Sequence, residues 1–185
     1  MNVWNQDEYT RAWNFASRAH QGQTVPGSGL AYINHIGNVT QEALAALTQG
    51  DGVDHPDLLM QCAILHDVIE DTEVTFEGVE SRFGLGVARG VAALSKNKSL
   101  PDKAAQMADS LERIRQCPRE IWMVKMADRI SNLQPPPENW SGKKIMRYQS
   151  EARMILDALG EANAFLSQRL CGKIEIYEKY AEGRP

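Results

Sequence analysis

The segment from residue 56 to residue 69 constrains the fold more than any other part of the sequence. It begins with Pro56, which suits the first turn of a helix. Apolar residues lie on nearly every side of the helix that this segment predicts: Leu58, Leu59, Cys62, Ala63, Ile64 and Leu65. A helix that is apolar all round has to be buried. We therefore expect it to be the central helix, with the other elements packed around it.

The rest of the chain also carries helical patterns. Tyr9, Trp13 and Ala16 recur at three- and four-residue steps, which indicates an amphipathic helix. Thr75 suits the N-cap of a short helix and Gly84 suits its end. The predicted helices span residues 6–20, 32–47, 56–69, 75–83, 86–94, 102–116, 119–133, 142–159 and 161–180. No segment of useful length alternates as a strand does, so we predict an all-α fold, an irregular bundle of about eight helices in one domain over residues 1–185.

Composition and charge exclude several classes of protein. Hydrophobic residues make up 43% and charged residues 24%, which is typical of a globular protein rather than a disordered one. A net charge of −4 gives no basic field to attract a nucleic acid polymer. The three cysteines form no CxxC pair, so we expect reduced thiols and no disulfide framework. No apolar run approaches the ~20 residues that span a bilayer. We expect a cytoplasmic protein without a membrane partner.

The central segment ends in a crowd of titratable residues. In CAILHDVIEDT, residues 62–72, His66 and Asp67 are adjacent, and Glu70 and Asp71 follow one helical turn later. The three carboxylates repel one another and oppose the helix dipole at a C-terminus. A divalent cation would compensate for this charge. Imidazole together with carboxylate suits Mn, Fe, Co, Ni or Zn better than Ca or Mg.

Further ligands for such a cation would come from other segments. His35, in AYINHIGNV, is one of four histidines and stands at the start of a helix after a glycine-rich loop. Asp128, in VKMADRISNL, stands in an otherwise apolar helix, where an unpaired carboxylate is costly. Each residue alone has a simpler explanation, such as an ion pair between Asp128 and Arg129. Taken together, these residues predict a metal site.

The order of these residues carries a family likeness. The series His35, His66–Asp67 and Asp128 resembles the HD superfamily of metal-dependent phosphohydrolases. More narrowly, YINH, LHDVIEDT, FG and KMADRISNL resemble the hydrolase domain of RelA/SpoT proteins and the stand-alone small alarmone hydrolases. The likeness spans about residues 10–160. It implies the HD-type helical fold.

The resemblance implies a reaction and a role for each matching residue. The family removes the 3′-diphosphate of guanosine tetra- or pentaphosphate, leaving GDP or GTP. Its one metal ion is usually Mn²⁺, and the matching ligands are His35, His66, Asp67 and Asp128. The matching pair that orients and activates the attacking water is Glu70 and Asp71. The matching positions for contacts with the nucleotide substrate are Lys98, Asn132, Lys144 and Tyr148.

The sequence departs from the family pattern in the loop before His35. The family has an Arg-Lys pair there, whereas this chain has Thr24 and Val25, and Ile36 replaces a proline that follows the histidine. The metal ligands are retained, but recognition of guanine is left open. One alternative is therefore an HD-type nucleotidase, phosphatase or phosphodiesterase with a different substrate. A non-catalytic nucleotide-sensing module and a helical scaffold with a chance HD dipeptide are two others. The sequence also leaves a homo-oligomer open.

Overall fold

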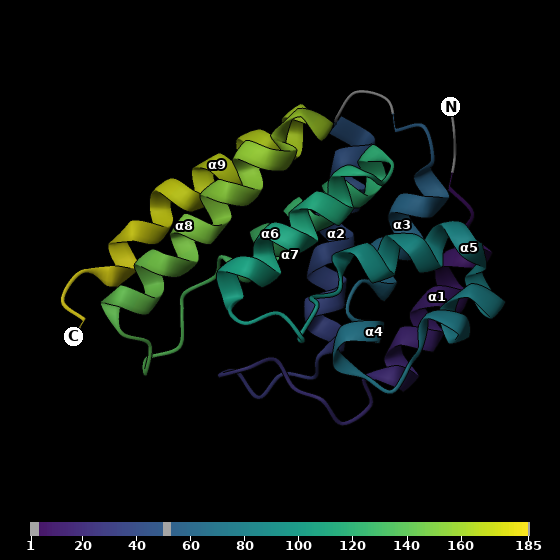
Figure 1. Cartoon of the computed structure of the whole chain (residues 1–185), viewed down its shortest axis with the longest axis horizontal. Coiled ribbons are helices and arrows are strands. Elements are labelled where there is room, and N and C mark those ends of the chain that lie inside the picture. The colour runs from purple at the N-terminus through teal and green to yellow at the C-terminus, as the bar shows by residue number, and fades with distance from the viewer. Residues whose placement is uncertain (1–3, 50–52, 185) are drawn as a thin grey trace.

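The computed structural model describes residues 4–49 and 53–184, and these residues form an all-α fold (Figure 1). An isolated bridge between Thr24 and Ala31 is the only extended pairing among the described residues. The helices are α1 (Gln6–Ala19), α2 (Ile33–Gln49), α3 (Pro56–Leu65), α4 (Val68–Asp71), α5 (Phe76–Leu94), α6 (Lys103–Arg115), α7 (Arg119–Asn132), α8 (Gly142–Leu159) and α9 (Ala164–Tyr177), with short 3-10 helices η1 (Gly160–Ala162) and η2 (Glu178–Ala181). The predicted all-α class is confirmed.

Helix α3 is the centre of the bundle, as its composition predicts. It packs against α1, α2, α5 and α7, and the side chains of Leu59, Ile64 and Leu65 are fully buried. Helix α7 contributes Ile121, Met126 and several other apolar residues to the same core. Helices α2, α3 and α7 each contact the other two. Side chains from all three helices can therefore meet at one point.

The remaining helices cover this core on two sides. Helices α8 and α9 run antiparallel and side by side, and α9 also packs on α7 (Figure 1). Helix α1 packs on the opposite side of α3, close to α5. The long segment between α1 and α2 crosses the same end of the molecule as α4 and the loop before α8 (Figure 1). No helix in the described part of the chain has the length and apolar character needed to cross a membrane.

The prediction of one continuous helix over residues 56–69 was wrong at its last turn. Helix α3 ends at Leu65, and α4 begins only at Val68. The ring of His66 lies 2.9 Å from the carbonyl oxygen of Ala63 through its Nδ1 atom, so a side chain occupies an acceptor at the helix end. Such competition between side chain and backbone ends helices. The last predicted helix is also shorter, because Asn163 caps α9 through a 3.0 Å bond from the amide of Leu166.

The predicted stop at Gly84 is confirmed by its backbone. Gly84 has φ of 84° and ψ of 164° inside α5, a backbone conformation that residues other than glycine rarely adopt. The two predicted helices, 75–83 and 86–94, are therefore the two arms of α5 on either side of this residue. The hydroxyl of Thr75 accepts a 3.2 Å bond from the amide of Gly78, as expected of an N-cap.

Gly90 provides a test of the packing between α5 and the core. A Cβ atom there would lie 2.5 Å from Ile121 Cδ1 and 2.9 Å from Cys62 Sγ. We expect Gly90→Ala to lower the free energy of unfolding by about 1–3 kcal/mol in urea titrations, because overpacking strains a filled core. Gly86→Ala is the matched control, since Gly86 lies in the same helix with open space around it. It should be neutral or stabilising by up to about 1 kcal/mol. Equal stability of the two variants would contradict this packing.

Candidate metal centre and cleft

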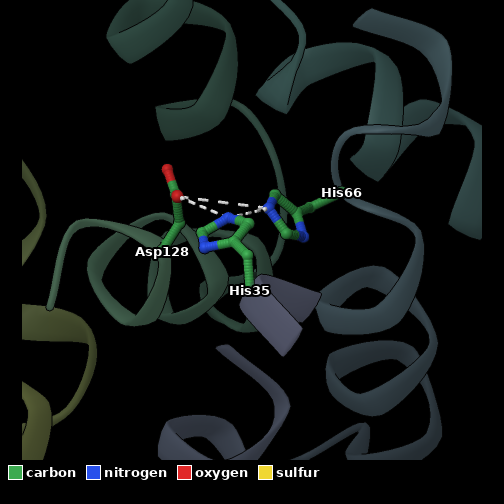
Figure 2. A group of neighbouring side chains, drawn as sticks. All are labelled: His35, His66 and Asp128. Atoms are coloured by element: carbon green, nitrogen blue, oxygen red, sulfur yellow. Dashed lines mark hydrogen bonds and ion pairs between the residues drawn. The ribbon is translucent and has the colours of Figure 1, made fainter. Parts of the chain in front are cut away.

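Three helices bring two histidines and an aspartate to one point. His35 lies in the first turn of α2, His66 directly after α3, and Asp128 in α7. The Nε2 atoms of the two histidines are 3.2 Å apart. Oδ1 of Asp128 lies 3.5 Å from Nε2 of His35 and 4.0 Å from Nε2 of His66. The three side chains point toward one another, each offering one donor atom (Figure 2).

Asp67 adds a fourth donor to this group. Its Oδ2 atom lies 2.8 Å from Nε2 of His66 and 3.6 Å from Nε2 of His35. His66 and Asp67 both lie in the break between α3 and α4, and these two consecutive residues both face the centre. The structure thus brings together all four residues that the sequence predicts as metal ligands.

Hydrogen bonds fix how the two imidazoles face the centre. A carbonyl oxygen can only accept, so Nδ1 of His66 carries the hydrogen and donates it to Ala63 at 2.9 Å. Nδ1 of His35 lies 3.3 Å from the hydroxyl oxygen of Ser131. Both rings therefore direct Nε2 toward the carboxylates. Binding of the other ring nitrogen to a polar group is the usual arrangement for histidines that hold a metal.

The two carboxylates are held by neighbours of their own. Oδ2 of Asp128 accepts a 3.1 Å bond from the ammonium of Lys125, and Oδ1 accepts a 2.5 Å bond from the amide of Asn132. Oδ2 of Asp67 accepts a 2.5 Å bond from the hydroxyl of Tyr32. Lys125 and Asn132 lie one helical turn before and after Asp128, so α7 itself supplies that support.

Electrostatics favour positive charge at the centre. Burial alone would lower the pKa of His35, but hydrogen bonds with Asp128 and Asp67 raise it to about 9. Burial opposes ionisation of Asp67, yet the charge of His66 and its hydrogen bonds hold the pKa of this carboxyl well below its usual range. The pKa of Asp128 is lowered in the same way, mainly by Lys125. Two imidazole nitrogens and two ionised carboxylates are a donor set that fits a divalent metal ion.

The predicted acidic pair lies on α4, beside the centre. Oε2 of Glu70 accepts a 2.8 Å bond from the backbone amide of Lys96, and Oε1 accepts a 3.0 Å bond from the same residue's ammonium. Burial and the neighbouring charges of Asp67 and Glu70 raise the pKa of the Asp71 carboxyl. Glu70 is thus anchored at both oxygens.

A cleft of about 1230 Å³ opens from this centre. All four predicted substrate contacts line it, together with Glu70 and Asp71: Lys98, Asn132, Lys144 and Tyr148. The ammonium of Lys98 donates to the carbonyl of Glu70 at 2.7 Å and lies 3.8 Å from Oδ1 of Asp71, on a side chain that is largely exposed. Asn132 is the same residue that bonds to Asp128, so the cleft floor and the metal centre share it.

One wall of the cleft is aromatic and cationic. The guanidinium of Arg129 lies 4.2 Å from the ring centroid of Tyr148, and Trp140 meets the same ring edge-on at 5.3 Å. The ammonium of Lys144 lies 3.9 Å from the centroid of Trp140. Cation–π contacts of this kind orient both partners. The burial of Tyr148 in this cluster makes it a packing residue as well as a cleft residue.

The loop before α2 forms the other wall, and this wall is largely apolar. Val25, Pro26 and Leu30 line the cleft there, as do the prolines at residues 135–137, and Gly27 of the same loop lies next to Pro137. Thr24 pairs with Ala31 through its backbone. The position at which the resembling family has basic residues thus provides apolar contact in this chain.

Three supporting residues were missed by the sequence analysis: Tyr32, Lys125 and Ser131. Lys125 stands three residues before Asp128, a helical spacing that could have revealed it. Tyr32 stands three residues before His35 but bonds to Asp67, in a different segment. Ser131 bonds to His35 across two helices. These last two contacts depend on tertiary packing that no local spacing reveals.

Comparison with known proteins identifies the family of this chain. A family model described as "HD domain" matches residues 12–162. Over 163 residues, the chain is 35% identical to guanosine-3′,5′-bis(diphosphate) 3′-pyrophosphohydrolase MESH1 of Danio rerio, covering 85% of this chain and 87% of that protein. Identity to the Homo sapiens protein of the same name is 32% over 164 residues, with coverage of 86% and 88%.

A solved structure is similar over almost the whole chain. It is described as a metazoan ortholog of SpoT that hydrolyses ppGpp, and it superposes with a TM-score of 0.81 at 25% sequence identity. The similarity covers 94% of this chain and 97% of that one. The match therefore extends beyond the motifs to the arrangement of the helices. This chain belongs to the HD domain family, in the group of its relatives named MESH1.

Proposed function

We propose that this chain removes the 3′-diphosphate of guanosine 3′,5′-bis(diphosphate) with the help of one divalent metal ion. The observation that carries the proposal is the meeting of His35, His66, Asp67 and Asp128 at one point, where His35, Asp67 and Asp128 line a cleft together with Glu70 and Asp71. The names of the relatives supply the substrate, because each is a guanosine-3′,5′-bis(diphosphate) 3′-pyrophosphohydrolase. We propose Mn²⁺ as the ion, because it is among the metals that mixed imidazole and carboxylate donors suit and is the usual ion of the family that the sequence resembles.

The acidic pair has a defined task in this proposal. A bound divalent ion supplies a Lewis acid that polarises a phosphoryl oxygen and makes a water molecule more acidic. Glu70 and Asp71 orient the attacking water and accept its proton. The water oxygen bonds to the phosphorus that carries the ribose 3′ oxygen, the bond between that phosphorus and the 3′ oxygen breaks, and the proton taken up by the acidic pair passes to the 3′ oxygen. The products are a 3′-hydroxyl nucleotide and diphosphate.

The cations of the cleft would hold the phosphates. Lys98 and Lys144 both line the cleft with exposed side chains, so their ammonium groups can reach a phosphate from two directions. Fixed cations stabilise charge that develops on the phosphoryl group. Tyr148 and Asn132 would contact the nucleoside.

We also propose that the chain is a single domain and works in the cytoplasm. The location rests on the three thiols, Cys62, Cys117 and Cys171, which are free and suit a reducing compartment.

One observation favours a second candidate, an HD-type phosphatase acting on a different nucleotide. The wall formed by Val25, Pro26 and Leu30 offers no fixed charge to a base or phosphate. A substrate whose base needs only apolar contact would fit it as well as guanosine does. This candidate keeps the metal chemistry and changes only the nucleotide.

A substrate panel with Mn²⁺ separates the two candidates. It contains guanosine tetraphosphate, its adenosine counterpart, nucleoside monophosphates and NADPH, and the products are resolved by ion-exchange chromatography. We expect GDP and diphosphate from guanosine tetraphosphate, with no turnover after chelation of the metal. Release of single phosphates from another nucleotide, without cleavage of guanosine tetraphosphate, would favour the second candidate. No turnover of any member would contradict both.

A further inference from the structure

Two acidic residues of the site lie where helical structure is interrupted. Asp67 falls between the end of α3 and the start of α4, and Asp71 is the last residue of α4, which has only four residues. The last carbonyls of a helix have no partner within it. The carbonyl of Asp71 therefore lacks a helical partner, although the amide of Asp71 donates to the carbonyl of Asp67 at 2.9 Å. Contacts from another segment complete the bonding of both residues.

Residues 20–32, the segment that links α1 to α2, make both contacts. The hydroxyl of Tyr32 donates to Oδ2 of Asp67 at 2.5 Å. The side-chain amide of Gln23 donates to the carbonyl oxygen of Asp71 at 2.7 Å. The amide of Tyr32 also donates to the carbonyl of Gln23 at 2.9 Å, which ties the two supports together. The segment of residues 20–32 therefore contacts both Asp67 and Asp71.

His20 contacts both Tyr32 and Gln23. Its ring is buried and stacks on the ring of Tyr32, with centroids 4.8 Å apart and planes at 26°. Its Nδ1 atom lies 2.8 Å from Oε1 of Gln23. The amide nitrogen of Gln23 is directed to Asp71, so its oxygen faces His20, and Nδ1 must carry the hydrogen. A continuous chain of hydrogen bonds then runs from His20 through Gln23 to Asp71, and such chains strengthen their members.

We propose that His20, Gln23 and Tyr32 are positioning residues, with Tyr32 aligning Asp67 for the metal and Gln23 aligning Asp71. Oδ2 of Asp67 is the oxygen nearest both imidazoles, so the Tyr32 bond aims this donor atom at the centre. Removing a polar group that bonds to a metal ligand commonly lowers metal affinity or activity by about 10–100-fold. The role of Gln23 rests on the proposed function, whereas the role of Tyr32 concerns metal binding alone.

Tyr32→Phe tests the first role, because it keeps the ring that stacks on His20 and removes only the hydroxyl. We expect the Kd for Mn²⁺, measured by calorimetry on the metal-free chain, to rise about 10–100-fold. The thermal midpoint of the metal-free chain should match that of the wild type. Tyr9→Phe is the control, since Tyr9 packs against Trp4 and Trp13 away from the cleft. It should leave the Kd unchanged.

Gln23→Met tests the second role, because methionine has a similar length and makes neither hydrogen bond. We expect kcat for guanosine tetraphosphate to fall about tenfold, with KM and the Kd for Mn²⁺ unchanged. His20→Phe keeps an aromatic ring on Tyr32 but breaks the bond to Gln23, so it should reproduce the Gln23→Met result.

The outcomes are separable from those of the proposed function. A Kd for Mn²⁺ within twofold of wild type in Tyr32→Phe, or a lowered thermal midpoint as its only change, would overturn the positioning role of Tyr32. Unchanged kcat in both Gln23→Met and His20→Phe would overturn the role of Gln23. A wild-type chain that binds no Mn²⁺ would overturn the proposed function together with this inference. Mn²⁺ binding without turnover would overturn the proposed function and the role of Gln23, but not the role of Tyr32.

Discussion

Replacing Asp128 with alanine should abolish turnover and also destabilise the metal-free protein. Asp128 supplies one donor to the centre, and its loss removes charge stabilisation worth several kcal/mol in the transition state. This corresponds to about 10³-fold or more in rate. The same change leaves the ammonium of Lys125 buried without its carboxylate. Breaking a buried pair in this way costs about 3–5 kcal/mol. Turnover, Mn²⁺ binding and urea unfolding would be measured together.

A second substitution separates the two effects. In the double variant Asp128→Ala/Lys125→Met the unpaired charge is gone, so we expect most of the lost stability to return while turnover and Mn²⁺ binding stay absent. Asp157→Ala, at an exposed position of α8, is the matched control and should resemble the wild type. Recovery of turnover in the double variant would contradict the ligand role of Asp128. So would an Asp128→Ala protein that binds Mn²⁺ normally.

Glu70→Gln should lower kcat by about 10²–10⁴-fold without loss of the metal. Loss of a positioned general base typically has an effect of this size. The substitution keeps the size of the side chain and one oxygen that can accept from Lys96, so the link between α4 and the loop after α5 is partly preserved. The Kd for Mn²⁺ should stay within a few-fold of wild type, because His35, His66 and Asp128 are untouched.

The control for this variant is Glu73→Gln, three residues further along the chain. Glu73 is exposed and does not line the cleft. Single-turnover measurements at saturating Mn²⁺ would compare the two proteins, so that slow product release cannot mask an effect on the chemical step. Equal rates for Glu70→Gln and the wild type would show that Glu70 takes no part in activating water.

Much of the fold was predictable because hydrophobic periodicity records which face of a helix is buried. The apolar surround of residues 58–65 identified the central helix, and Thr75 and Gly84 marked boundaries through their own backbone preferences. The break after Leu65 was not predictable in the same way. It coincides with the bond from the ring of His66 to the carbonyl of Ala63, a competition between side chain and backbone that hydrophobic periodicity does not record.

The site divides along the same line. Its four donors and the acidic pair were predicted from local motifs and a family resemblance. The structure brings the four donors together, and all six residues except the buried His66 line one cleft. Tyr32 was missed because its partner, Asp67, lies 35 residues away in the sequence. The apolar character of the wall at Val25 was visible in the sequence, but only the folded chain shows that this wall and residues 135–137 line the same cleft.

The most direct test of the account is to titrate the metal-free chain with Mn²⁺ while following diphosphate release from guanosine tetraphosphate in the same sample. The account predicts no release before metal is added, a rise in proportion to bound Mn²⁺, and saturation at one ion per chain. Full turnover in the presence of a chelator, or saturation only at two ions per chain, would contradict a single metal centre formed by His35, His66, Asp67 and Asp128.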